Sequence, residues 1–166
     1  MRNCLVVCAT KQRSACEVAA HIANELRLRD VAVDLECSSD ISDIGDYDAV
    51  IIGARLCHGR WKRSTKRFLR QHREKLLARD VALFIPAPCA AGEKAYNRSW
   101  KRLIRMMRRI EWLNPVRIEL FSDRELPGEI SCCPQGEQSK IAQWCRSLTV
   151  SMGMSDRQTP NQPGIT

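Results

Sequence analysis

Residues 5–26 contain a short apolar run that passes through a polar loop directly into an amphipathic helical pattern. The apolar run 5–8 ends in the loop 10–14, and apolar residues then recur at helical spacing: Val18, Ala19, Ile22, Ala23 and Leu26. A buried strand that enters a helix in this way leaves N–H groups of the loop and of the first helical turn without internal partners, and the helix dipole adds partial positive charge. The segment therefore predicts an anion site suited to the phosphate of a nucleotide or a flavin. The alternative is an ordinary strand-to-helix turn with Ser14 as its N-cap.

The rest of the chain repeats this alternation of apolar runs and helical patterns. Further strands are predicted at residues 31–37, 50–53, 81–85 and 116–121, and the apolar–polar alternation of the first is typical of an edge strand. Helices are predicted between and after them: one with Phe68, Leu69, His72 and Leu76 on one side, one at about 93–110, and one marked by Ile141, Trp144, Cys145 and Leu148. This order indicates a parallel sheet covered on both faces. In such sheets ligands bind beyond the carboxyl ends of the strands, so the loops after Ala9, Gly53 and Ile85 are expected to converge.

Three segments of the chain show a family resemblance. Flavodoxin-like proteins carry a phosphate-loop segment that is similar to ATKQRSACEVAAHIANEL, and two more flavin-loop segments that are similar to DYDAVIIGARLCHGRW and FLRQHREKLLARDVALFIPAP. Within this family the chain most resembles the short single-domain branch that includes the menaquinone-dependent protoporphyrinogen IX dehydrogenases, over roughly the first 90 residues. The resemblance implies an α/β fold, a flavodoxin-like three-layer sandwich with a five-stranded parallel sheet in order 2-1-3-4-5. It also implies FMN at the first and third strands.

The resemblance further implies that the three loops hold the FMN. The candidate cofactor-binding residues are Thr10, Lys11, Gln12, Arg13, Ser14 and Ala15 in the first loop, Ala54, Arg55, Leu56, Cys57, His58, Gly59 and Trp61 in the second, and Pro86, Ala87, Pro88, Cys89, Ala90 and Gly92 in the third. We expect His58 or Trp61 to pack near the flavin ring, with Tyr96 and Trp100 as alternates. Otherwise, His58 is an exposed loop histidine and Trp61 covers the edge of the core.

Four positions depart from the pattern of the family. Members usually carry Gly where Arg13 stands and Thr where Ala15 stands, so this chain loses backbone freedom and one hydroxyl donor to the phosphate. Pro86 and Pro88 stand where Ser or Gly is usual, and they remove two N–H groups from the third loop. Because Lys11 and Arg13 can pair with the phosphate in compensation, we predict that FMN is retained.

Length and composition favour a single domain at residues 1–152, followed by a disordered tail at 153–166 that is rich in Pro, Gln, Ser and Thr. No apolar stretch approaches the roughly 20 residues of a membrane span, and the first apolar run is too short for the core of a signal peptide. We expect a cytoplasmic protein that can associate peripherally with the membrane.

The net charge of +8 is concentrated in two of the predicted helices. Their basic residues are Lys62, Arg63, Lys66, Arg67, Arg70 and Arg73 on the first, and Lys94, Arg98, Lys101, Arg102, Arg105, Arg108 and Arg109 on the second. A solvated outer face over a core-packed stripe is the first interpretation. A docking surface for an anionic membrane that supplies a quinone acceptor is the second. We expect no nucleic acid partner, because no recognition motif supports one.

The nine cysteines are expected to be reduced thiols, and none of them has the spacing of a zinc site. Cys4 and Cys8 lie on a buried strand, where cysteine acts as a small hydrophobe. Cys57 and Cys89 are expected to contact the ring. The adjacent pair Cys132–Cys133 is either redox-active or two free loop thiols.

These observations predict an FMN-binding, flavodoxin-like oxidoreductase or electron-transfer protein that needs no catalytic triad, carboxylate pair or metal. One alternative is a quinone-dependent protoporphyrinogen IX dehydrogenase of haem biosynthesis, although the segment between Pro88 and Trp100 is shorter than the basic insertion of those enzymes. The other alternative is a degenerate flavodoxin fold that acts as a non-flavin binding or regulatory module. The four departures named above favour it.

Overall fold

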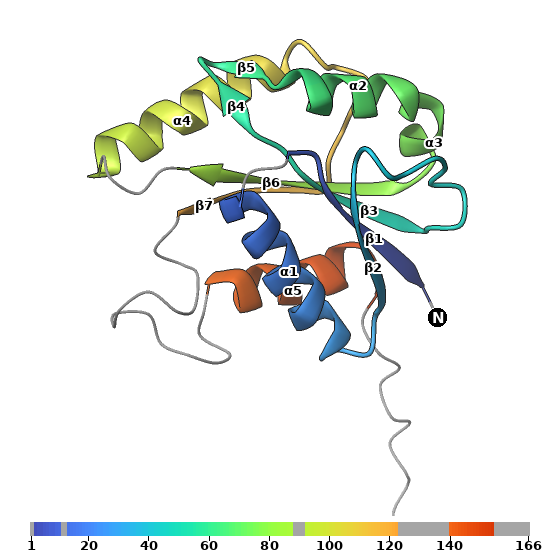
Figure 1. The fold of residues 1–166 in the computed structure, drawn as a ribbon. Helices are drawn as coiled ribbons and strands as arrows, with labels where there is room; N and C mark the ends of the chain where they lie inside the picture. Colours follow the sequence, from blue (N-terminus) through green and yellow to red (C-terminus); the bar gives the residue numbers. More distant parts are fainter. Residues whose placement is uncertain (1, 11–12, 88–91, 123–139, 155–166) are drawn as a thin grey trace, which may run out of the picture.

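The computed structural model describes residues 2–10, 13–87, 92–122 and 140–154 of the chain. Its elements in chain order are β1 (Asn3–Cys8), α1 (Arg13–Arg27), β2 (Ala32–Cys37), β3 (Ala49–Gly53), β4 (Leu56–Cys57), β5 (Arg60–Trp61), α2 (Arg63–Gln71), α3 (Arg73–Leu77), β6 (Asp80–Ala87), α4 (Gly92–Met107), β7 (Arg117–Ser122) and α5 (Lys140–Ser151). Strands and helices alternate as predicted, apart from the short β4–β5 hairpin and a break between α2 and α3 (Figure 1).

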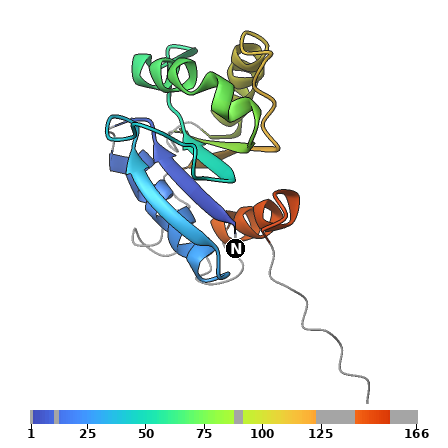
Figure 2. The ribbon, with the colours of Figure 1, turned by 90° about the vertical axis from the view of Figure 1, so that its right-hand side faces the viewer.

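Five of these strands form one parallel sheet in the order β2-β1-β3-β6-β7. Counted without the separate β4–β5 hairpin, this is the predicted order 2-1-3-4-5, with β2 at an edge. Helices α1 and α5 cover one face of the sheet, and α2, α3 and α4 cover the other, so the molecule has three layers (Figures 1 and 2). The predicted fold class is confirmed.

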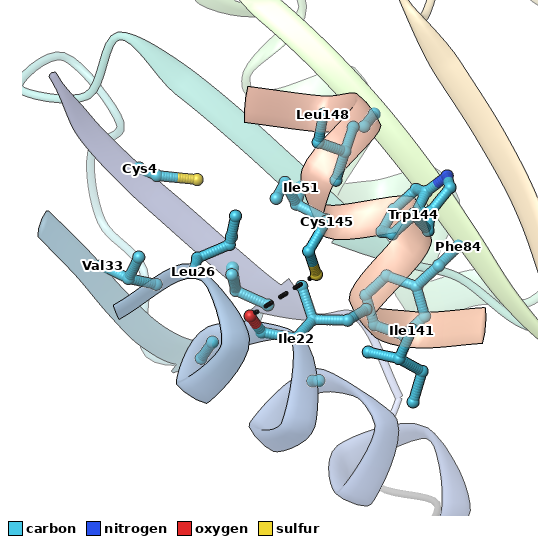
Figure 3. Close-up of a cluster of buried hydrophobic side chains, with 14 of the residues drawn as sticks. Cys4, Ile22, Leu26, Val33, Ile51, Phe84, Ile141, Trp144, Cys145 and Leu148 are labelled. Carbon is cyan, nitrogen blue, oxygen red and sulfur yellow. Dashed lines mark hydrogen bonds between the residues drawn. The ribbon is translucent and has the colours of Figure 1, made fainter. Parts of the chain in front are cut away.

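Side chains that alternate along the strands divide the apolar residues into two cores. On β1, Cys4 and Val6 point into the core under α1 and α5, whereas Leu5 and Val7 point into the core under α2, α3 and α4. Figure 3 shows the first of these cores, where side chains of α1 and α5 meet over β1 and β3. The central strands are therefore buried on both faces, as their continuous apolar runs indicate.

His72 interrupts the helix that was predicted between β3 and β6. It follows the last residue of α2 and precedes the first residue of α3, with φ −107° and ψ 15°. Its side chain is only 4% exposed, and its ring centroid lies 4.7 Å from that of Phe68. Burial lowers the pKa of His72, because a buried imidazole is harder to charge.

The packed part of the chain reaches Met154, past the predicted domain boundary at residue 152. Met154 is 8% exposed, belongs to the core under α1 and α5, and donates its N–H to the carbonyl of Thr149 at 2.7 Å. The rest of the predicted tail, 155–166, lies outside the described residues. None of the helices in the described ranges is long and apolar enough to cross a bilayer.

Candidate functional site

The carboxyl ends of β1 and β3 meet at one edge of the sheet, beside β6. The N–H of Ala9 donates to the carbonyl of Gly53 at 3.0 Å, and the N–H of Ala54 donates to the carbonyl of Phe84 at 3.0 Å. The strand order also reverses here, because β2 lies on one side of β1 and β3 lies on the other. Doubly wound sheets bind their ligands at such a point.

Gly53 ends β3 at a position where only a residue without a side chain fits. A Cβ atom on Gly53 would lie 2.3 Å from Cζ of Phe84. The Phe84 ring cannot turn away freely, because its centroid also lies 6.4 Å from the ring centroids of Phe121 and of Trp144. The close approach of Gly53 and Phe84 thus fixes the sheet directly below the site.

The loop between β1 and α1 places polar groups where the sequence predicts a phosphate. Thr10 follows β1, is 4% exposed, and holds its Oγ1 3.5 Å from Nζ of Lys62. Ser64 donates its hydroxyl to the carbonyl of Ala9 at 2.6 Å, which ties the start of α2 to the end of β1. Helix α1 begins at Arg13 and directs the N–H groups of its first turn back toward this loop. A buried hydroxyl, a lysine and a helix N-terminus together are a suitable set of donors for an anion.

The other predicted residues of this loop have varied placements. Arg13 is exposed and its Nε donates to Oε1 of Glu17 at 2.8 Å, so its charge is directed along α1. Ala15 is fully buried in the core under α1 and α5. Ser14 belongs to the first turn of α1. Lys11 and Gln12 lie outside the described residues. Within the described part of the chain, Lys62 is the cation that lies beside Thr10.

The chain after β3 forms the β4–β5 hairpin rather than an open loop. Leu56 pairs with Trp61, and the turn between the two strands is made by His58 and Gly59. Their φ angles are both positive, 50° and 75°, which is the combination that a type I′ turn requires. His58 is exposed at the tip. Gly59 lies against α4, since an added Cβ would be 3.8 Å from Cδ of Arg102.

Other residues of this second segment have structural contacts. Ala54 is fully buried, and the carbonyl of Arg55 accepts the N–H of Lys62 at 3.2 Å. Cys57 is the last residue of β4. Trp61 is 4% exposed within the core under α2, α3 and α4, and its Nε1 has no hydrogen-bond partner among the described residues. The indole of Trp61 thus belongs to this core, and its contact with a flavin ring stays a prediction.

The two alternate aromatic residues form a pair on α4. Tyr96 and Trp100 are half-buried, and their rings meet edge to face with centroids 6.4 Å apart. Nζ of Lys140, at the start of α5, lies 5.3 Å from the centroid of the Tyr96 ring. This contact links α4 to the opposite layer at one end of the sheet.

Two prolines were expected in the third loop, but Pro86 lies in the sheet. Pro86 and Ala87 are the last residues of β6 and pair with Phe121 and Ser122 of β7. Because β3 ends at the level of Phe84, Pro86 has only one neighbouring strand, and a proline is tolerated at such a local edge. Pro88, Cys89 and Ala90 lie outside the described residues. Gly92 is the first residue of α4.

The helices beside the site form a layer of strong positive charge, here called the basic layer and defined as α2, α3 and α4. Glu74 and Glu93 are the acidic residues of these three helices, and the Lys and Arg residues far outnumber them. Lys75, paired with Asp43, is the one basic residue of the layer with an ion pair inside the described ranges. A pocket of about 410 Å³ opens between α2 and the chain that follows β2, lined by Ser38, Ser39, Ile41, Arg63, Ser64, Arg67 and Gln71.

Lys62 and Ser64 were not predicted as site residues. The sequence predicts Lys62 only as part of a basic helix face, and it predicts no role for Ser64. The contacts of Lys62 with Thr10 and of Ser64 with Ala9 follow from the sheet order, because the helix after β3 starts beside β1 once those two strands are neighbours. Within the described ranges, no three His, Cys, Asp or Glu side chains gather as a metal site would require.

Comparison with known proteins agrees with this architecture. The chain matches the model of a family described as the flavodoxin domain over residues 5–125. Among solved structures it is similar to a short-chain flavodoxin associated with a non-canonical PDU bacterial microcompartment, at 16% identity and TM-score 0.60, with 92% of this chain and 99% of that chain covered. It is also similar to oxidised flavodoxin 1 from Bacillus cereus, at 16% identity and TM-score 0.56, with 92% and 97% covered.

A third similar structure is an NADH:FMN oxidoreductase in its apo form, at 8% identity and TM-score 0.58, with 96% of this chain and 92% of that chain covered. No curated protein matches the chain. At these identities the structural neighbours show the fold alone. The family model, in contrast, covers most of the sequence. The chain therefore belongs to the flavodoxin domain family.

Proposed function

We propose that this chain binds FMN and serves as an electron-transfer protein or oxidoreductase, with the FMN phosphate in the loop between β1 and α1. The observation that carries the proposal is the buried Thr10 hydroxyl, 3.5 Å from Nζ of Lys62, directly ahead of the N-terminus of α1. These donors stand at the point where the strand order reverses. FMN supplies hydride or single-electron chemistry when it is bound.

The chain's own residues would share the work of holding and orienting the cofactor. Thr10 and Lys62 would bind the phosphate, and the first N–H groups of α1 would add to the positive potential. The β4–β5 hairpin, with His58 at its tip, would flank the ring. Arg13 pairs with Glu17 and does not point toward Thr10, so Lys62 would supply the positive charge at the phosphate instead.

A narrower role is a quinone-dependent protoporphyrinogen IX dehydrogenase that works at an anionic membrane. The basic layer supports it, because peripheral binding at a lipid surface would bring the site close to a quinone acceptor. The opposite alternative, a flavodoxin fold without flavin, is favoured by the side chains of Arg13, which pairs with Glu17, and of Ala15, which is buried and has no hydroxyl.

Calorimetric titration with FMN tests the proposal. Lys62→Gln should weaken FMN binding by about 1.5–3 kcal/mol, since it removes a charge-assisted contact to the phosphate. Lys62 makes no side-chain cap to α2, so its loss leaves the helix start unchanged. Ser14→Asp should also weaken binding, because it adds a like charge beside the phosphate. Lys66→Gln, one turn further along α2 and exposed, is the matched control and should bind FMN like the wild type.

Three results would redirect the proposal. Unchanged affinity in both Lys62→Gln and Ser14→Asp would place the phosphate elsewhere. If Lys66→Gln loses as much FMN affinity as Lys62→Gln does, the effect comes from the overall charge of the protein and not from a contact with the phosphate. A folded wild-type protein that binds no flavin would leave the non-flavin module as the function.

A further inference from the structure

Two thiols lie next to each other across the loop between β1 and α1. Sγ of Cys8, the last residue of β1, is 2.8 Å from Sγ of Cys16 in the first part of α1. Both thiols also share one acceptor, the carbonyl of Thr10, at 2.8 Å from Sγ of Cys8 and 3.4 Å from Sγ of Cys16. The end of β1 and the start of α1 are therefore in contact through two free thiols.

We propose that Cys8 and Cys16 are a site of reversible oxidation, at which hydrogen peroxide oxidises the two thiols to a disulfide that links the end of β1 to α1. The sulfur atoms have to approach each other from 2.8 Å to about 2.0 Å to bond. Rotation of the two side chains can supply a change of this size. In a reducing compartment such a bond is expected to be transient, as in redox sensors.

The two thiols differ in their access to solvent, which sets the order of events. Cys8 is 4% exposed, and burial, together with its hydrogen bond to Cys16, raises the pKa of Cys8 to about 12. Cys16 is half-buried at the margin of the same core and is the thiol that an oxidant can reach. We therefore assign the first oxidation to Cys16 and the second step to Cys8.

The reaction balances with hydrogen peroxide as the oxidant. The Cys16 thiol takes one oxygen atom from the peroxide and becomes a sulfenic acid, and one water is released. The sulfur of Cys8 then attacks the sulfur of that sulfenic acid, so the S–S bond forms as the S–O bond breaks. The hydroxyl group leaves with the proton of Cys8 as a second water. A small dithiol reverses the change by thiol–disulfide exchange.

Three other cysteines are useful in a test: Cys4 and Cys145 as controls, and Cys37 as a thiol that competes with Cys16 for Cys8. Cys4 and Cys145 are fully buried, so an oxidant in solution does not reach them, and among the described residues neither has a sulfur contact with Cys16 as Cys8 has. Sγ of Cys145 instead contacts the carbonyl of Ile22 inside the core, as Figure 3 shows. Cys37 is exposed and stands opposite Cys8 in the pairing of β1 with β2, so it is the competing partner for Cys8.

Peptide mapping of the flavin-free full chain tests the proposal without relying on FMN. The protein is treated with one equivalent of hydrogen peroxide, unfolded in N-ethylmaleimide and digested with trypsin. Cleavage after Lys and Arg places Cys4 and Cys8 in peptide 3–11, Cys16 in peptide 14–27 and Cys37 in peptide 30–55. We expect peptide 3–11 to be linked to peptide 14–27, and dithiothreitol to separate them. The link should persist in Cys4→Ala, which assigns it to Cys8.

Cys16→Ser should abolish the link, and Cys145→Ser should leave it intact. Cys16 is half-buried, so this substitution is compatible with a folded chain, which circular dichroism can verify. A main product that links peptide 3–11 to peptide 30–55 would overturn the proposal. So would Cys16 recovered mainly as the maleimide adduct or as a sulfinic acid.

Discussion

A single residue without a side chain determines how the sheet packs below the candidate site. Gly53 faces the ring of Phe84, and that ring is held in turn by two other aromatic rings. The space that a methyl group would need is therefore already filled. Small-to-large changes in packed cores force side chains off their preferred rotamers.

Gly53→Ala should lower the free energy of unfolding by about 1–3 kcal/mol, because its Cβ overlaps the Phe84 ring. Phe84→Leu in the same chain should relieve part of this loss, so the double variant should be more stable than the sum of the single changes predicts. Urea denaturation of the four proteins measures this coupling. Gly45→Ala, whose Cβ would lie nearest to the exposed side chain of Asp43, at 3.3 Å, is the control. Strict additivity of the Gly53 and Phe84 changes would contradict the contact.

His72 makes the stability of the protein sensitive to pH. Its pKa is lowered by burial in the native state, so the unfolded chain binds a proton more readily. The free energy of unfolding should therefore fall as the pH drops below the ordinary histidine pKa of about 6.5. Asp43, which favours the charged imidazole, and Lys75, which opposes it, are the charged groups that act on His72.

His72→Phe should flatten this pH dependence, since it keeps a ring beside Phe68 and removes the titration. Denaturation curves at about pH 7.5 and about pH 5.5 provide the comparison. His21→Gln, a change in a half-exposed histidine of α1, serves as the control for the loss of one histidine. If His72→Phe loses as much stability on acidification as the wild type does, another group is responsible.

At the scale of elements, the apolar pattern predicts the five sheet strands and most helices, because those elements are buried on one or both faces. It cannot reveal the β4–β5 hairpin, since strands of two residues show no periodicity. The break at His72 is missed because Phe68 and Leu76 continue one apolar face through it. The sequence predicts a loop at Pro86, because proline is rare inside sheets. Its place in β6 is possible only because β3 ends at the level of Phe84, which the sequence does not reveal.

The same limit applies to the candidate site. The loop that contains Thr10 can be located from the sequence, because a strand, a polar loop and a helix follow one another directly. The role of Lys62 cannot be predicted from the sequence, because Lys62 lies near Thr10 only when β1 and β3 are neighbours in the sheet. Local pattern therefore locates the loops, and topology selects which side chains meet there.

The β4–β5 hairpin carries a prediction of its own. His58 has a φ of 50°, a left-handed conformation that Asn adopts more readily and that a β-branched residue avoids. His58→Asn should raise the free energy of unfolding by about 0.5–1 kcal/mol, and His58→Val should lower it by about 1–2 kcal/mol. Thermal unfolding of both variants checks the two signs. Equal stability of the Asn and Val variants would mean that the tip is not left-handed in solution.

At the scale of the molecule, the excess of positive charge is concentrated on one side of the sheet. The basic layer lies on one side of the sheet, and its many Lys and Arg face only Glu74 and Glu93 within the same helices (Figure 1). Exposed Ile104 stands among them on α4, and exposed Leu77 on α3. An anionic lipid surface would match both the charge and these apolar side chains.

Vesicle sedimentation should therefore increase with the content of anionic lipid and fall with salt. The screening length shortens from about 8 Å at physiological ionic strength to about 3 Å at 1 M. Replacing Lys101 and Arg105 with Gln should weaken binding by about 1 kcal/mol per charge. The same change at Arg13 and Arg146, exposed on α1 and α5, should weaken it less. If vesicle binding changes neither with salt nor with the content of anionic lipid, the basic layer is only a solvent-exposed face of the protein.

The separation into two cores also has a spectroscopic consequence. Trp144 lies in the core under α1 and α5, whereas Trp61, with Trp100 and Trp112 at its margin, lies in the core on the opposite face. Each face of the sheet thus contains its own intrinsic fluorophore. Chains in which the indoles of one face are replaced by Phe would report on the other face alone. If the sheet and its two helical layers unfold as one cooperative unit, both emission signals will change at the same urea concentration.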